Sequence, residues 1–77
     1  MPIITSKLNV LIAERELREN RRLSIRTIAT ESGASFSAVQ RLKNNTIKEV
    51  PLDDLARICS YFGVGVEAIL VVEERPT

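Results

Sequence analysis

Ser24–Asn45, with the sequence SIRTIATESGASFSAVQRLKNN, decides how the rest of the chain is interpreted. Two short amphipathic segments lie on either side of Gly33 in this stretch. Glycine adopts the left-handed conformation that ends a helix with almost no steric penalty. Ser24 and Ser35 each precede one of the segments, where a serine oxygen caps the first turn of a helix. The stretch therefore predicts two short helices joined by a tight turn.

The two predicted helices span residues 25–32 and 36–43, and their apolar residues give them a common inner face. The inward residues are Ile28, Ala29, Ala38, Val39 and Leu42. Two helices that cross steeply over a turn of about three or four residues form a helix-turn-helix. The second helix of that motif lies in the DNA major groove. The pattern therefore predicts a helix-turn-helix in which residues 36–43 form the recognition helix.

Two further helices are expected on either side of this motif. Residues 7–20 place apolar side chains at helical spacing, namely Leu8, Leu11, Ile12 and Leu17. Glu14 and Arg18 have the order and spacing of a favourable ion pair on that helix. A helix is also expected from about residue 52 to residue 61 or 62, between Pro51, which favours a helix start, and Gly63, which favours a helix end.

The C-terminal segment allows two interpretations. Residues 66–72 are either a fifth helix or a turn of helix followed by a strand. Their β-branched end mirrors Ile3-Ile4, so the two termini are expected to pair in a small ribbon or to form a dimer seam. The fold class favoured is an all-α, compact five-helix bundle with possible short terminal strands. It forms one domain over residues 1–77, with its core at about 7–72 and peripheral segments at 1–5 and 73–77.

Length and composition limit the possible functions. The chain has 77 residues, one cysteine and no histidine, so neither an internal disulfide nor a metal site is expected. Small domains without these aids often gain stability from a partner subunit, which favours a homodimer. No apolar run approaches the roughly 20 residues that span a bilayer, and no signal peptide is evident. A soluble, cytoplasmic protein without cofactor or small-molecule ligand is expected.

The charge distribution is more informative than the net charge of +1. Residues 1–48 carry nine cations against four anions, whereas residues 49–77 carry two cations against six anions. This asymmetry gives the molecule a preferred face toward phosphate, unless the charges only form ordinary solvated surfaces. The usual catalytic groups are missing, since there is no histidine and no glycine-rich phosphate loop, so the chain is not expected to be an enzyme.

The order and spacing of these residues resemble the Cro and phage-repressor type helix-turn-helix family, also called the Xre family. The resemblance covers residues 8–70. It is carried by Leu8-x-x-Leu11, Leu23-Ser24-Ile25-x-x-Ile28-Ala29, Gly33-Ala34-Ser35, Val39-x-x-Leu42, Asn44, Leu52-x-x-Leu55-x-x-Ile58-Cys59-x-x-Phe62-Gly63-Val64 and Ile69-Leu70. It implies a lambda-repressor-like bundle that binds double-stranded DNA. Departures from the family pattern are Ile25 and Phe36, at positions that are usually polar, together with Gly65 and Ala68 near the expected fifth helix.

Outward residues of the motif are the candidates for DNA contact. The candidates for base contact are Ser35, Phe36, Ser37, Gln40 and Arg41. The candidates for phosphate contact are Arg21, Arg22, Ser24, Arg26, Lys43, Asn44, Asn45 and Lys48. Arg41 is the first choice for direct readout, because a guanidinium can donate two hydrogen bonds to guanine, although a phosphate contact stays open. Phe36 either contacts a thymine methyl group or folds back onto the core.

The function expected from this pattern is a sequence-specific DNA-binding transcriptional regulator, chiefly a repressor. A homodimer would place its recognition helices in successive major grooves about 34 Å apart, so the operator would be an inverted repeat. The alternative is an antitoxin-like or accessory protein-interaction module that keeps the fold without reading DNA. In that case, charge reversal at Arg41 and Lys43 would leave the function intact.

Overall fold

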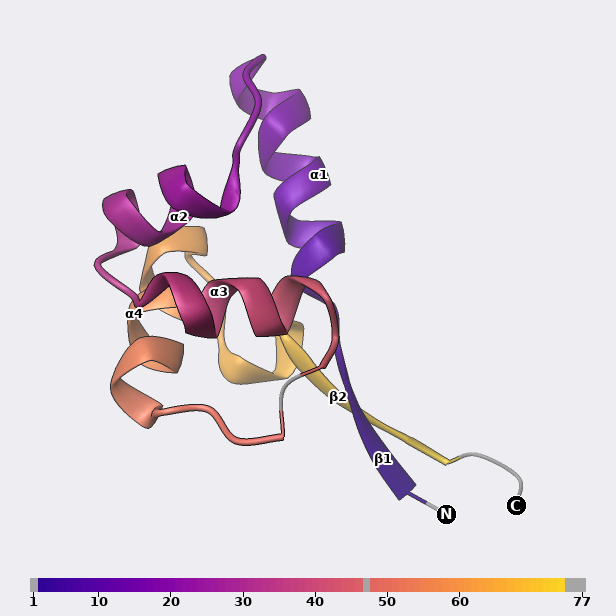
Figure 1. The fold of residues 1–77 in the computed structure, drawn as a ribbon. Coiled ribbons are helices and arrows are strands. Elements are labelled where there is room, and N and C mark those ends of the chain that lie inside the picture. The colour runs from indigo at the N-terminus through magenta and orange to yellow at the C-terminus, as the bar shows by residue number, and fades with distance from the viewer. Residues whose placement is uncertain (1, 47, 75–77) are drawn as a thin grey trace.

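The computed structural model describes residues 2–46 and 48–74, as a helical body from which a two-stranded ribbon projects (Figure 1). The elements in chain order are β1 (Pro2–Ser6), α1 (Leu8–Glu19), α2 (Ile25–Ser32), α3 (Phe36–Lys43), α4 (Leu52–Phe62), the 3₁₀ helix η1 (Val66–Ala68) and β2 (Leu70–Glu74). The second and third helices match their predicted bounds, and the first and fourth match theirs to within one residue. The helix-turn-helix expected from Ser24–Asn45 is therefore present.

Local capping explains why the two helices of this motif begin and end where they do. The Ser24 hydroxyl accepts a hydrogen bond from the Thr27 amide at 3.1 Å, and the Ser35 hydroxyl accepts one from the Ala38 amide at 3.2 Å. Each bond satisfies an amide that the first turn of a helix leaves unpaired. Gly33 ends α2 with a φ of 81°, in the left-handed region that favours glycine.

The hydrophobic core draws one or more side chains from every α-helix. The largest fully buried side chains are Leu8, Ile28, Val39, Leu42, Ile58 and Ile69. Leu23 fills the core where the chain turns from α1 into α2, and Cys59 is buried as expected for a small apolar residue. These contacts hold α3 against the body by one face and leave its other face at the surface.

The prediction that Leu17 belongs to the apolar stripe of α1 is wrong, because its side chain is 85% exposed. An α-helix has about 3.6 residues per turn, and Leu17 comes nine residues after the buried Leu8, about two and a half turns along α1. Its side chain therefore points to the side of the helix opposite to Leu8. The predicted Glu14–Arg18 pair does not form either, and Arg15 instead pairs with Glu19 on the same helix.

The prediction of a fifth α-helix and of an all-α fold is also wrong, because the described chain has four α-helices and a short sheet. Residues 66–68 make only a 3₁₀ turn, in which the Ile69 amide donates to the Val66 carbonyl at 2.9 Å. Gly65 precedes this turn and offers no side-chain cap. The β-branched residues that follow fit an extended strand better than a helix, and β1 provides the strand with which they pair.

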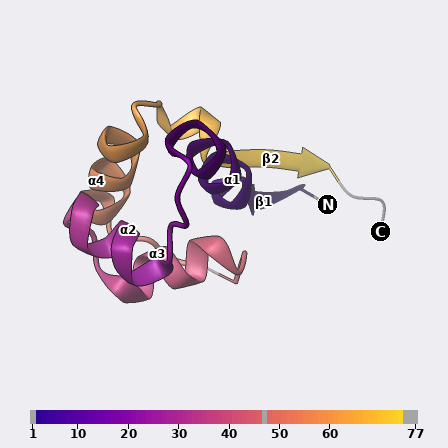
Figure 2. The same cartoon turned by 90° about the horizontal axis from the view of Figure 1, so that it is seen from above.

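Of the two arrangements that the sequence left open for the termini, the structure has the ribbon, in which the two ends of the chain pair with each other. Strands β1 and β2 run antiparallel, with Ile4 opposite Val72 and Ser6 opposite Leu70. The ribbon extends beyond the helices in both Figure 1 and Figure 2, two views that differ by a rotation of 90°. Ile4 and Val72 are 65% and 67% exposed, so this part of the ribbon has little cover from the helical body.

An ion-pair network ties α1, α2 and α4 together on one side of the body. Arg21 pairs with Glu19 at 2.7 Å and with Glu31 at 2.8 Å, and the Tyr61 hydroxyl donates to Glu31. The Arg15 guanidinium lies 4.5 Å from the centre of the Tyr61 ring, close enough for a cation–π interaction. The hydrogen bonds from Arg21, and then from Tyr61, lower the pKa of Glu31 from 4.5 to about 2.

Candidate nucleic-acid interface

The recognition helix α3 presents a polar surface with one aromatic residue at its start. Ala38, Val39 and Leu42 are buried, which follows from their spacing along the helix. The exposed positions between them are Phe36, Ser37, Gln40 and Arg41. Four of the five residues predicted to contact bases therefore lie on α3 with exposed side chains, and Ser35 lies directly before its first turn. Phe36 is 46% exposed and is not among the residues that pack against the core, so its side chain lies at the surface.

The N-terminal end of α3 is held by two side chains from α4. Asp54 accepts hydrogen bonds from the Ser35 amide at 3.2 Å and from the Ser35 hydroxyl at 3.1 Å. Arg57, one turn further along α4, donates to the Gly33 carbonyl at 3.2 Å. The turn of the motif is thus fixed at both of its ends. Because the hydroxyl proton of Ser35 is already committed to Asp54, Ser35 serves mainly to position α3.

The C-terminal end of α3 is fixed from the opposite side of the molecule. The Asn9 side chain, on α1, donates to the Lys43 carbonyl at 2.7 Å. The Asn45 side chain accepts a hydrogen bond from the Ser6 amide at 2.8 Å. Asn45 also has a positive φ of 56°, which an asparagine tolerates better than most residues. Sequence reasoning missed Asn9, because no spacing pattern links it to a carbonyl 34 residues further along the chain.

Three of the predicted phosphate contacts converge on one surface hollow. This hollow has a volume of about 340 Å³, and Arg22, Ser24 and Lys43 line it together with Asn9 and Glu16. The Glu16 carboxylate accepts a hydrogen bond from the Leu23 amide and offsets part of the positive charge there. The hollow lies between α1, the start of α2 and the end of α3, so the side chains come from parts of the chain far apart in sequence. The amide groups of a helix N-terminus favour an anion, and α2 begins at this hollow.

A second hollow lies at the C-terminal end of α3. Its volume is about 280 Å³, and Arg41, Thr46, Lys48 and Glu49 line it. The structure thereby brings the predicted base contact Arg41 close to the predicted phosphate contact Lys48. Glu49 places one carboxylate in the same hollow, which offsets part of the positive charge there.

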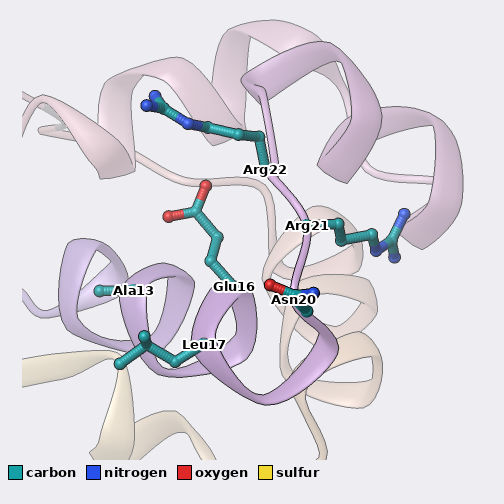
Figure 3. A pocket seen from close by; sticks show the side chains of 6 residues that line it. All are labelled: Ala13, Glu16, Leu17, Asn20, Arg21 and Arg22. Atoms are coloured by element: carbon teal, nitrogen blue, oxygen red, sulfur yellow. The ribbon is translucent and has the colours of Figure 1, made fainter.

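Arg21 lies apart from these groups. Its guanidinium forms a two-bond contact with Glu31, at 3.0 and 2.8 Å, and a further bond with Glu19. Figure 3 shows Arg21 and Arg22 pointing to opposite sides of the loop that joins α1 and α2, with Glu16 directed toward the side of Arg22. Arg21 is therefore occupied in the fold, and Arg22 is the member of this pair available to a ligand.

The other candidates are spread along the same motif. Arg26 is exposed on α2, and Asn44 is exposed at the C-terminal cap of α3. Ile25, at a family position that is usually polar, packs against the core instead. Its side chain therefore strengthens the fold and offers no group to a phosphate.

The described residues contain no cluster of three or more metal-ligating side chains. Among the same residues, no helix is long and apolar enough to cross a membrane. Cys59 is buried and its thiol pKa is raised by burial, so it lacks the features of a reactive thiol.

Fold and site together define a helix-turn-helix DNA-binding domain, since α3 is anchored at both ends and carries exposed polar side chains between them. Residues 7–75 match the family described as the Cro/C1-type HTH DNA-binding domain, and the chain belongs to that family. Comparison with curated proteins and with solved structures gives no match.

Proposed function

We propose that this protein is a sequence-specific transcriptional regulator that acts as a homodimer, chiefly as a repressor, on an inverted-repeat operator. The family match supports a DNA-binding regulator, and the exposed polar side chains of α3 are the groups that we assign to the reading of sequence. No effector or catalytic segment is needed in this account, because a dimer bound over a promoter excludes polymerase by occupancy.

The observation that carries the proposal is the distribution of free cations. Lys7, Arg15 and Arg21 form ion pairs with Glu73, Glu19 and Glu31, of which only Glu31 belongs to the motif. Among the described residues, no ion pair involves the basic side chains on and around the motif, which are Arg22, Arg26, Arg41, Lys43 and Lys48. In the same part of the chain, two cations outside the motif also lack an ion pair: Arg18 on α1, and Arg57 on α4, which donates to the Gly33 carbonyl. Unpaired cations around one helix attract a polyanion, and phosphate contacts supply most of the affinity of such a protein.

The side chains divide into two roles in this proposal. Arg41, Gln40 and Ser37 read base edges, with Phe36 available for the methyl group of thymine. Residues around the start of α2 and the C-terminal end of α3 bind phosphates and fix the register on the duplex, namely Arg22, Ser24, Arg26, Lys43, Asn44 and Lys48. Asn45 and Ser35 support the helix by hydrogen bonds within the protein.

Selection of bound duplexes from a randomised library tests this function. The enriched sequences should contain an inverted repeat whose half-sites are separated by about one helical turn, roughly 34 Å. Binding to the enriched duplex should weaken steeply as salt rises while discrimination against a scrambled duplex persists. The absence of any enriched sequence at every salt concentration would rule out the proposal.

A protein-interaction module is the second candidate, and one observation favours it. Leu17 is 85% exposed and lines an open hollow of about 460 Å³ with Ala13 and Glu16. A single exposed leucine is common on protein surfaces, so Leu17 favours docking only through its place beside this hollow. This candidate predicts that selection yields no enriched duplex and that reversing the charges of Arg41 and Lys43 leaves the function unchanged.

A further inference from the structure

The terminal ribbon has two edges, and only one of them is free to pair with another strand. In an antiparallel ladder, alternate residues direct their backbone groups toward the partner strand and away from it. The Lys7 amide donates to the Ile69 carbonyl at 2.7 Å, so Lys7 and Ile69 face each other across the ribbon. By alternation, the backbone groups of Ser6, Ile4 and Pro2 on β1 point outward, as do those of Leu70, Val72 and Glu74 on β2.

The outer edge of β1 is obstructed at both ends. The Ser6 amide already donates to the Asn45 side chain at 2.8 Å. Pro2 has no amide proton, so it offers no donor at the other end of the strand. Only Ile4 keeps an outward amide available on this edge. A second strand would therefore gain few hydrogen bonds by pairing here.

The outer edge of β2 carries neither obstruction. Within the described residues, no hydrogen bond occupies the outward amides of Leu70, Val72 and Glu74. A two-stranded ribbon is marginally stable by itself, and an exposed edge of this kind is a template for strand addition. Ile4 and Val72 lie directly opposite each other, so their side chains are on the same face of the ribbon, and both are exposed.

We infer that the free edge of β2 pairs antiparallel with β2 of a second copy of this chain, which gives a four-stranded sheet in the order β1-β2-β2-β1. Full overlap of the two five-residue strands places the symmetry axis at Val72. Leu70 then lies opposite Glu74 of the other copy, and Val71 lies opposite Glu73. No two carboxylates face each other directly in this register, whereas a shift that centres the pair on Glu73 would oppose two of them.

The apolar side chains of the ribbon support the same partner. In the proposed sheet, Ile4 and Val72 of one copy and the same two residues of the other form a continuous apolar row across four strands. Cross-strand pairs of β-branched residues are favourable contacts in antiparallel sheets. A partner rich in charge on this face would lose those contacts, so a second copy fits better than an acidic or basic peptide.

This inference rests on the homodimer of the proposed function, and its test needs no DNA. Val72→Pro and Ile4→Pro are a matched pair, because each removes an outward amide from one edge and leaves the amides between β1 and β2 in place. Mass measured by sedimentation over a range of protein concentrations should show a dimer for the wild type and for Ile4→Pro, and a monomer for Val72→Pro. A wild-type monomer, or dimer loss in Ile4→Pro with retention in Val72→Pro, would overturn the inference.

Cysteine cross-linking separates edge pairing from a general effect of proline on the ribbon. Residues of a hydrogen-bonded antiparallel pair have Cα atoms about 5.5 Å apart, within the range that a disulfide spans. Val72→Cys should therefore form a covalent dimer under mild oxidation, and Ile4→Cys should not. The native Cys59 is buried and does not compete. Failure of Val72→Cys to cross-link more than Ile4→Cys contradicts the pairing, whatever the proline variants show. A protein that dimerises but binds no DNA would instead contradict only the proposed function.

Discussion

Asp54, in the first turn of α4, accepts two hydrogen bonds from Ser35, the residue that caps the recognition helix. The same hydroxyl of Ser35 accepts a bond from the Ala38 amide, so a single serine links α4 to the first turn of α3. The orientation of α3 relative to the body thereby depends on a carboxylate that would itself make no contact with bases. This arrangement suggests which substitutions should affect α3 without touching its outward face.

Asp54→Ala should destabilise the protein and weaken DNA binding together. Asp53→Ala is the matched control, because both carboxylates lie in the first turn of α4 and interact alike with the helix dipole. The free energy of unfolding, measured with urea, should fall by about 1 kcal/mol more for Asp54→Ala than for Asp53→Ala. Equal effects of the two substitutions would show that the bonds to Ser35 contribute nothing to stability.

Stability at low pH should depend on Glu31. Its folded-state pKa of about 2 lies below the ordinary value of 4.5, because Arg21 and Tyr61 donate hydrogen bonds to the charged carboxylate. A depressed pKa contributes stability that is fully present above pH 4.5 and is lost as the pH falls toward 2. The unfolding free energy of Glu31→Gln should therefore decline less over this interval than that of the wild type.

The control for this measurement is Glu14→Gln, since Glu14 is a glutamate of α1 without an ion pair among the described residues. It should keep the wild-type dependence on pH. The difference between wild type and Glu31→Gln should also shrink in concentrated salt, because the network is exposed to solvent and salt screens exposed pairs. A wild-type pH profile in Glu31→Gln would contradict this account of the network.

Thr5→Val should stabilise the protein. The Thr5 hydroxyl is buried on β1 and has no hydrogen-bond partner in the described part of the chain. Valine keeps the shape and the β-branched side chain while removing the unpaired hydroxyl, which should raise the unfolding free energy by about 1 kcal/mol. Thr27→Val should have the opposite sign, since the Thr27 hydroxyl is bonded to that of Ser24 at 2.9 Å. Destabilisation by both substitutions would indicate that the Thr5 hydroxyl is satisfied in solution.

Lys43→Ala should weaken DNA binding without altering sequence preference. Lys43 lines the same hollow as Arg22 and Ser24, and we assign this hollow to a DNA phosphate. Loss of one phosphate contact should reduce affinity for all duplexes alike. It should also make the decline of log affinity with log salt shallower, by about one unit of slope. A change in preference between duplexes, with the salt slope unaltered, would assign Lys43 to base readout instead.

The sequence predicted the helix-turn-helix well because its boundaries are set locally. Ser24, Ser35 and Gly33 act on amides and carbonyls within a few residues, so their identity and position are enough to place the helix ends. The same reasoning failed for Leu17, because the residue was assigned to the apolar stripe of α1 for its apolar side chain, without regard to the direction in which that side chain points from the helix. It also favoured a fifth α-helix over a strand, since the strand depends on pairing with residues at the other end of the chain.

The hydrogen bonds that orient α3 could not be predicted from local sequence, because their partners are far apart along the chain. Asp54 and Ser35 are 19 residues apart, and Asn9 and the Lys43 carbonyl are 34 residues apart. Only the folded chain brings these groups together, so no spacing pattern identifies them. Outward positions of α3, by contrast, follow from the helical period alone, which is why the exposed polar side chains at Ser37, Gln40 and Arg41 were predicted correctly as surface residues.

The most direct test of the central claim, that α3 reads DNA sequence, is the discrimination of Arg41→Ala between a selected duplex and a scrambled one. Arg18→Ala is the control, because it removes the same charge from α1, outside the motif. Dissociation constants measured at one fixed salt concentration should show that Arg41→Ala loses about 1 to 3 kcal/mol of discrimination, while Arg18→Ala keeps the wild-type ratio. Retention of the wild-type ratio by Arg41→Ala would contradict the assignment of base readout to this residue of α3.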